Sequence, residues 1–178
     1  MTNQNRIAVV TGGSRGIGRS IALALAARGF DLVITWKASK AAAGSVVDEI
    51  LKSGGKARAL QLDVSDVDSF PSFAEQIPHV DVLVNNGAAG VGGPFEQVNS
   101  ATFDQLVAEH FKGPFFLTQA LLPRMRPGAR VINITSAVTR FTFPGTPGYS
   151  SVKAATEALT RALAVELGPK GITFNAVA

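Results

Sequence analysis

The feature of this sequence that most constrains its fold is the alternation of short apolar runs, rich in β-branched residues, with longer segments of helical periodicity. Parallel strands need crossover connections, and both faces of a parallel sheet need a covering layer. The alternation therefore predicts an α/β fold, with a doubly wound parallel sheet and three layers, α/β/α. Six strands are expected, at residues 7–11, 31–36, 57–62, 80–84, 130–135 and 172–177.

Two stretches between these strands predict particular helix positions. A helix from about residue 101 is expected to turn Phe103, Leu106, Val107 and Phe111 inward. A further helix is expected over 113–125, with a turn at 126–128. The last long helix is expected to begin at Pro147 with Thr146 as its cap.

Composition limits the kind of protein and the kind of partner. A chain of 178 residues that is 46% hydrophobic fits one domain over 1–178. The absence of cysteine excludes a disulfide scaffold, and two histidines are too few for a histidine-rich metal site, so no metal is expected. No signal peptide or membrane span is recognisable, which predicts a cytoplasmic location. The net charge of +4 comes from dispersed cations, so neither nucleic acid nor a membrane is an expected partner.

A glycine-rich loop follows the first strand and opens a helix. Backbone amides at such a helix N-terminus can bind a pyrophosphate, and glycine permits its close approach. The loop therefore predicts a Rossmann-like dinucleotide site, with a tight turn that binds no ligand as the alternative. The residues expected to contact the cofactor here are Gly12, Ser14, Arg15, Gly16, Ile17 and Gly18.

The end of the second strand indicates which dinucleotide fits. An NAD-specific site places a carboxylate there to bind the ribose hydroxyls. Here the strand ends in Trp36-Lys37 without a carboxylate, and Arg15 lies in the glycine-rich loop. Two cations near the ribose favour a 2′-phosphate and hence NADP(H) as the cofactor. Alternatively, both cations are solvated surface charges.

Tyr149 and Lys153 are four residues apart at the start of the last long helix, so they lie on one helix face. An ammonium beside a phenol favours the ionised phenol, which suits proton transfer near neutral pH. Ser136 ends the fifth strand, at the sheet edge where ligands of such folds bind. Alternatively, the pair is a solvated tyrosine with a surface lysine, and the serine is a turn former.

In their order along the chain, these motifs resemble the classical short-chain dehydrogenase/reductase family over essentially the whole sequence. The resemblance rests on Thr11-Gly12-x-x-x-Gly16-x-Gly18, Asp63-Val64, Asn85-Asn86-Gly87, Ser136 and Tyr149-x-x-x-Lys153. Residues 57–64 and 132–137 are most similar to 3-oxoacyl-acyl-carrier-protein reductases. The family implies hydride transfer between NADPH and a small or acyl-linked ketone, and a homo-oligomer, tetramer or dimer.

The resemblance also implies a role for each matched residue. Ser136 would hydrogen-bond the substrate carbonyl, Tyr149 would be the general acid/base, and Lys153 would hold the nicotinamide ribose. Further cofactor contacts would come from Asp63, Val64, Asn86 and Gly87.

Three departures from the family pattern affect this expectation. Asn85-Asn86-Gly87-Ala88 exchanges the last two residues of the usual Asn-Asn-Ala-Gly, and little consequence is expected. His110 stands where the family has a fourth catalytic residue, an asparagine whose main-chain carbonyl holds a water; it is either catalytic or a helix-packed histidine. The sequence ends before the family's last strand and substrate-covering segment, so either it is incomplete relative to the gene product or the protein is a truncated relative. The alternative to an active reductase is therefore a truncated, non-catalytic NADP(H)-binding or assembly module.

Overall fold

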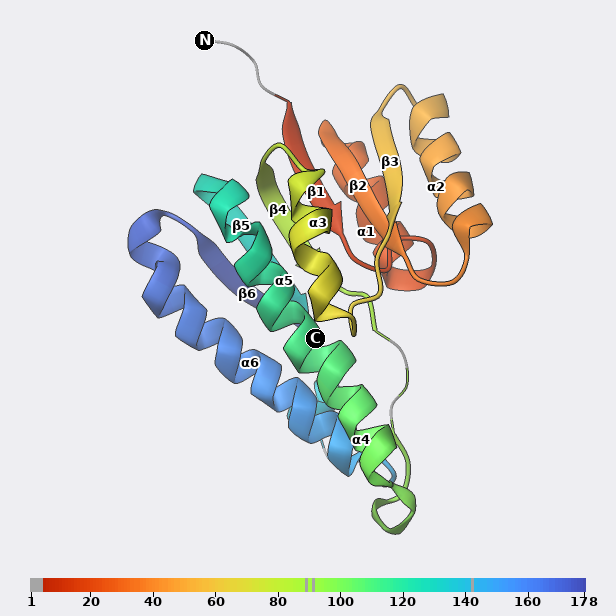
Figure 1. Cartoon of the computed structure of the whole chain (residues 1–178), viewed down its shortest axis with the longest axis vertical. Helices are drawn as coiled ribbons and strands as arrows, with labels where there is room; N and C mark the ends of the chain where they lie inside the picture. Colours follow the sequence, from red (N-terminus) through yellow and green to blue (C-terminus); the bar gives the residue numbers. More distant parts are fainter. Residues whose placement is uncertain (1–4, 89, 91, 142) are drawn as a thin grey trace.

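The computed structural model describes residues 5–88, 90, 92–141 and 143–178. Its strands are β1 (Arg6–Val10), β2 (Phe30–Trp36), β3 (Lys56–Gln61), β4 (Val80–Asn85), β5 (Met125–Ile134) and β6 (Thr173–Val177). All neighbouring strands pair in parallel, in the order β3-β2-β1-β4-β5-β6 (Figure 1). The chain winds outward from β1 to one edge and then from β4 to the other, which confirms the predicted doubly wound sheet.

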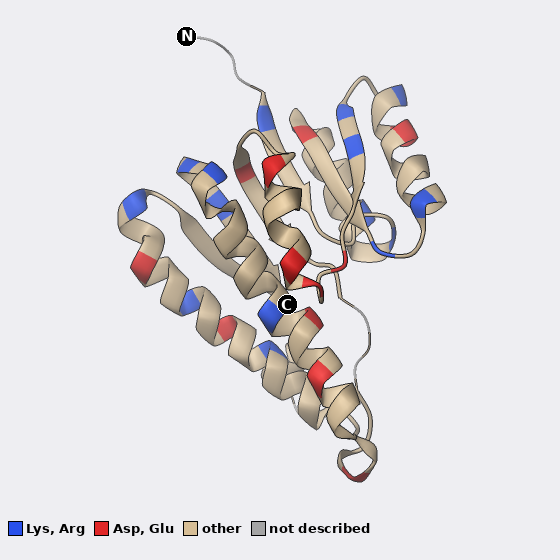
Figure 2. Ribbon diagram, in the orientation of Figure 1, with Lys and Arg blue, Asp and Glu red and all other residues tan. Residues whose placement is uncertain are grey.

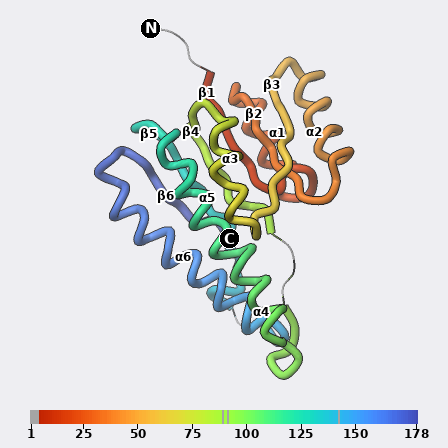
Figure 3. The backbone as a smooth tube through the Cα atoms, in the orientation of Figure 1, coloured from red at the N-terminus to blue at the C-terminus, as the bar shows by residue number. Residues whose placement is uncertain are grey.

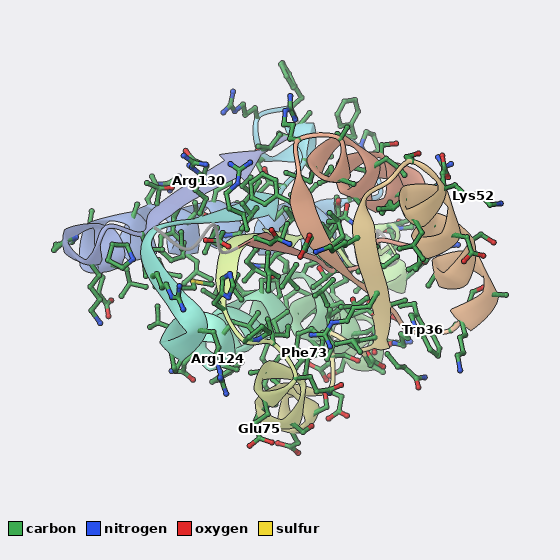
Figure 4. All side chains as sticks on the ribbon, turned by 90° about the horizontal axis from the view of Figure 1, so that it is seen from above. Trp36, Lys52, Phe73, Glu75, Arg124 and Arg130 are labelled. Carbon is green, nitrogen blue, oxygen red and sulfur yellow. The ribbon has the colours of Figure 1, made fainter. Side chains whose placement is uncertain are left out.

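The helices are α1 (Gly16–Ala26), α2 (Lys40–Lys52), α3 (Phe70–Glu75), α4 (Ser100–Val107), α5 (Gly113–Leu121) and α6 (Pro147–Leu167). α1 and α2 pack on one face of the sheet, and α3, α5 and α6 pack on the other. Seen from above, Phe73 and Glu75 of α3 lie on the side of the strands away from α1 (Figure 4). The three predicted layers are therefore present.

Each face of the sheet carries its own apolar cluster. One cluster joins Phe70 of α3 to Leu83 of β4, and the other joins Val46 of α2 to Val84 of β4. Consecutive residues of a strand point to opposite faces, so β4 contributes to both clusters. Both layers of helices therefore depend on the same central strands.

Towards β6, the face that α1 and α2 occupy is exposed. Val131 and Phe174 are buried against the α5 and α6 side. Arg130, Thr173 and Asn175, which alternate with them, are exposed. The helices of this face therefore cover β1 to β4 better than β5 and β6.

The segment between α5 and β5 differs from the prediction. α5 ends at Leu121, and a 3₁₀ turn, Leu122–Arg124, follows it. β5 then begins at Met125, so the expected turn at 126–128 lies within the bounds of the strand. The register against β4 shifts at this point, which means that the extra residues bulge out of the ladder.

Two side-chain predictions were wrong. Thr146 is the first residue before α6, but its hydroxyl donates to the Phe143 carbonyl at 2.8 Å and makes no cap. Phe103 is 42% exposed, whereas Leu106, predicted on the same inward face, is buried.

α4 and α5 are joined by a π-helical turn, Ala108–Lys112, so the chain stays helical across Gly113-Pro114. Proline lacks the N–H of a regular helix, and a π turn changes the hydrogen-bond pattern locally. A Cβ on Gly113 would collide with the Val64 carbonyl oxygen, so only glycine lets the helix pack this closely on the segment after β3. The π turn therefore lies beside the ends of the strands.

Candidate active site

The residues singled out in the sequence gather at the carboxyl ends of the strands. Gly12, Lys37, Asp63, Asn86 and Ser136 follow β1, β2, β3, β4 and β5, each within two residues of the strand end. Because the strands are parallel neighbours, these positions lie along one edge of the sheet (Figure 3).

The segment after β4 supports the glycine-rich loop. Thr11 Oγ1 accepts hydrogen bonds from the backbone N–H groups of Asn86, at 2.9 Å, and Gly87, at 2.8 Å. Asn86 Nδ2 donates to the Thr11 carbonyl at 2.9 Å. A Cβ on Gly87 would lie 2.8 Å from the Gly12 nitrogen, so glycine lets this segment pack directly on the glycine-rich loop. The expectation that the exchange of Gly87 and Ala88 has little consequence stays a prediction.

The N-terminus of α1 is suited to an anion. Gly12 and Gly16 take φ angles of 63° and 53°, which bend the chain into the helix, and Ser14 is half-buried between them. A Cβ on Gly18 would collide with the Gly12 carbonyl oxygen, so the loop lies directly on the first helical turn. Among the described residues, no side chain caps this end, its first turn carries no acid, and Ile17 is 64% exposed. These features fit the pyrophosphate of a dinucleotide.

Lys37 lies between two carboxylates, and Arg15 is exposed on the loop. Lys37 Nζ is 2.9 Å from Asp63 Oδ2 and 3.4 Å from Glu109 Oε1. The hydrogen bond to Asp63 raises the pKa of Lys37, although burial opposes this effect. Burial alone would raise the pKa of Asp63, but hydrogen bonds from Ser65 and Lys37 lower it overall. Lys37 is therefore an ion-paired residue and not a plain solvated cation.

Ser136 lies just after β5, and Tyr149 and Lys153 lie in the first two turns of α6. Ser136 Oγ accepts a hydrogen bond from the Val138 N–H at 3.4 Å, and both Ser136 and Tyr149 are half-buried. Lys153 Nζ donates to the Ile134 carbonyl at 2.7 Å and lies 5.7 Å from the centre of the Tyr149 ring. Burial lowers the pKa of Lys153 to about 8. The tyrosine and lysine share one helix face, as their spacing predicts.

His110 is buried next to Tyr149. The two ring centres are 5.1 Å apart at an interplanar angle of 82°, which is an edge-to-face contact. His110 Nε2 is 3.3 Å from the Gly90 carbonyl oxygen. The main-chain carbonyl of His110 accepts a hydrogen bond from Thr156 Oγ1 at 2.7 Å. The carbonyl that the resemblance assigns to a water is thus engaged by a side chain.

A buried polar network connects the strands to the helices behind the site. Asn85 Nδ2 donates to Thr118 Oγ1 at 3.2 Å and to Asn133 Oδ1 at 2.8 Å. Asn133 Nδ2 donates to Thr160 Oγ1 at 2.8 Å. Buried polar groups that are paired in this way hold β4, β5, α5 and α6 in one arrangement.

The sequence interpretation missed two residues at this site, Glu109 and Thr156. Thr156 lies three residues after Lys153, so helical spacing could have placed its hydroxyl on the same face. Glu109 carries no such signal, because a helical glutamate is usually solvated and its burial depends on the π turn.

The described part of the chain shows no sign of two other kinds of site. None of its helices is long and apolar enough to cross a membrane. Its histidine and acidic side chains form no group of three or more that could hold a metal ion. Lysines and arginines are distributed among acidic residues over strands and helices (Figure 2).

Comparison with known proteins identifies the family. A model described as short chain dehydrogenase matches residues 6–178. The 3-oxoacyl-[acyl-carrier-protein] reductase FabG of Staphylococcus epidermidis is 38% identical over 181 residues, covering 98% of this chain and 74% of that protein. A blue fluorescent protein from a metagenomic library, solved in complex with NADPH, has a TM-score of 0.91 and 37% identity over 98% of this chain and 74% of its own.

The angucycline C-6 ketoreductase LanV, solved with bound NADP, has a TM-score of 0.92 at 34% identity. That match covers 97% of this chain and 71% of LanV. Three findings identify the same family: the sequence match, the parallel sheet and the placement of the motifs at its edge. The chain belongs to the short-chain dehydrogenase family.

Proposed function

We propose that this chain is an NADPH-dependent reductase that converts a ketone to a secondary alcohol, with Tyr149 as the general acid. The observation that carries the proposal is that an uncapped helix N-terminus follows β1 and that Lys153 is bonded to the end of β5, at the same edge of one parallel sheet. Family membership supports an oxidoreductase. The solved relative described as a ketoreductase with bound NADP supports the substrate and cofactor classes.

The cofactor would lie along the carboxyl ends of the strands. The loop amides and the N-terminus of α1 would bind the pyrophosphate, and Arg15 and Lys37 would face the 2′-phosphate. Because Lys37 shares its charge with Asp63 and Glu109, Arg15 would supply the larger attraction. The other residues proposed to line the cofactor are Gly12, Ser14, Gly16, Ile17, Gly18, Val64, Asn86, Gly87, Tyr149 and Lys153.

Bound NADPH supplies a hydride to the carbonyl carbon of the substrate. As negative charge grows on the carbonyl oxygen, the Tyr149 hydroxyl donates its proton to that oxygen and Ser136 donates a hydrogen bond. The Lys153 ammonium, held by the Ile134 carbonyl, stabilises the phenolate that remains on Tyr149. The edge contact from His110 keeps the Tyr149 ring in position.

Replacement of Tyr149 by phenylalanine tests this function. The variant loses the proton donor but keeps a ring against His110, so ketone turnover should fall by about 100-fold or more. NADPH binding should stay within about twofold of the natural chain, because the phenol oxygen is a small part of a large contact. NADPH absorbance with a panel of ketones measures turnover, and NADPH fluorescence measures binding.

The control is Ser151→Ala, since Ser151 is exposed on the same turn and its hydroxyl donates to the Pro147 carbonyl of its own helix at 2.8 Å. It should leave both readouts unchanged. Unchanged turnover in Tyr149→Phe would contradict the proposed mechanism.

A second candidate is a non-catalytic NADP(H)-binding module. Two observations favour it: His110 fills the place of the expected asparagine, and its carbonyl is engaged by Thr156. The same two measurements separate the candidates. NADPH binding without oxidation by any ketone supports the module, whereas oxidation that depends on Tyr149 supports the reductase.

A further inference from the structure

Four exposed phenylalanines surround the start of α6, the helix that carries Tyr149. We call Phe95, Phe103, Phe141 and Phe143 the phenylalanine rim; their exposed fractions are 81%, 42%, 64% and 53%. They come from three segments: the 3₁₀ turn after β4, α4, and the loop that leads from Ser136 to α6. A contiguous group of large, exposed apolar side chains commonly marks a binding surface.

The backbones of two members of the rim are bonded within the loop that leads from Ser136 to α6. The Phe141 N–H donates to the Ala137 carbonyl at 2.9 Å, one residue after Ser136. The Phe143 carbonyl accepts a hydrogen bond from the Thr146 hydroxyl at 2.8 Å, just before α6. These two rings therefore lie on the short connection between the proposed serine and tyrosine.

The other two members reach the same place from the β4–α4 side. A Cβ built on Gly148 would lie 3.4 Å from the Phe103 ring, so Phe103 packs on the residue that precedes Tyr149. A Cβ on Gly145 would lie 4.0 Å from the nitrogen of Pro94, the neighbour of Phe95. The starts of α4 and α6 lie together at one end of the molecule (Figure 1).

The geometry points to a substrate class: the proposed reductase site takes ketones joined to an aromatic ring system, which the phenylalanine rim contacts while Tyr149 meets the carbonyl. This inference rests on the proposed function. Phenyl rings attract other rings by offset and edge-to-face stacking, beyond the burial of area alone. A flat, rigid ring system can contact several of these side chains at once without the loss of rotational freedom that a flexible acyl chain suffers.

The test compares two ketones of nearly equal size. 2-Tetralone carries an aromatic ring beside its carbonyl ring, and 2-decalone is the saturated bicycle. The natural chain should show a kcat/KM for 2-tetralone about tenfold or more above that for 2-decalone, as expected for one to two good stacking contacts. NADPH absorbance follows both reactions, and cyclohexanone serves as a small reference ketone.

Phe143→Leu and Phe95→Leu keep an apolar side chain but remove the ring. Each should lower the 2-tetralone to 2-decalone ratio about threefold or more, mainly through KM. Phe116→Leu is the matched control, because Phe116 is 38% exposed on α5 and lies outside the rim. It should leave the ratio unchanged.

A ratio near one in the natural chain, or a ratio that neither rim variant changes, would overturn the inference. The inference would also be overturned if the natural chain is a dimer and both variants are monomeric without a change in the ratio, because the rim would then contact a second copy. Absence of turnover with all three ketones would count against the reductase itself. In that case, saturation-transfer NMR on NADP⁺-loaded protein decides the inference, and binding of 2-tetralone no tighter than 2-decalone contradicts it.

Discussion

Lys153 is the residue at which proposed function and stability conflict. Its buried ammonium donates a hydrogen bond to the Ile134 carbonyl, and burial lowers its pKa from 10.5 to about 8. Below about pH 8 both the folded and the unfolded chain hold the proton, and the full cost of burying the charge destabilises the fold. Between about pH 8 and 10.5 only the unfolded chain holds it, so stability rises with pH in this window.

Lys153→Met should therefore stabilise the protein near pH 7, by about 1–3 kcal/mol, while it removes turnover. The advantage should shrink as pH rises from about 8 to about 10.5, because the natural chain then loses its charge. Urea unfolding across this range measures the difference, and Lys52→Met at the exposed end of α2 is the control. A variant that is less stable at pH 7, or a difference that does not vary with pH, would contradict this account.

At single residues, the sequence predicts geometry within an element better than pairing between elements. The shared face of Tyr149 and Lys153 follows from helical periodicity alone. The ion pairs of Lys37 with Asp63 and Glu109 depend on how β2, the end of β3 and the π turn come together, which no local pattern encodes.

Among the elements, the π turn between α4 and α5 shapes the site most. It places His110 with its ring against Tyr149 and its carbonyl against Thr156. The Thr156 hydroxyl also lies 3.1 Å from the Val152 carbonyl of its own helix, so it links α6 to the π turn. π turns are frequent at functional sites because they reposition side chains without ending the helix.

Thr156→Val should lower stability by about 1–3 kcal/mol, because it removes a donor from a buried carbonyl at nearly constant volume. Turnover should fall as well, since the contact between His110 and Tyr149 loses its support. Thr156→Ser keeps the hydroxyl and should recover most of both. Thermal unfolding and NADPH oxidation are the readouts, and a valine variant equal to the natural chain on both would refute the coupling.

The strands were predictable because buried parallel strands give continuous apolar runs, and five of the six begin and end within two residues of their expected bounds. β5 starts earlier, since Arg126-Pro127-Gly128 gives turn signals that the fold uses for a bulge inside the strand. Phe103 was misplaced because helical spacing identifies an apolar face but does not say which apolar residue stays exposed at its edge.

At the scale of the whole molecule, the two apolar clusters are coupled through the central strands. Leu83 belongs to the cluster under α3 and α5, whereas its neighbour Val84 belongs to the cluster under α1 and α2. Trp36, the single tryptophan, packs against the second cluster. If the chain is one cooperative domain, a substitution that destabilises the first cluster must also shift the unfolding transition observed at Trp36.

Leu83→Ala should cost about 2–5 kcal/mol, because Leu83 is fully buried. Trp36 fluorescence and far-UV circular dichroism should shift to lower urea together, with a single transition. Leu51→Ala, at a half-exposed position on α2, is the control and should change little. A Trp36 transition that stays in place while the circular dichroism shifts would show two independent units.

The central claim is that this chain moves a hydride from NADPH to a ketone with Tyr149 as the acid. Its most direct test is NADPH deuterated at the transferable position, with 2-tetralone as the acceptor and mass spectrometry of the alcohol. The natural chain should yield alcohol with one deuterium on the carbinol carbon, and Tyr149→Phe should yield almost none in the same time. Unlabelled alcohol, or equal labelling by both proteins, would contradict the claim.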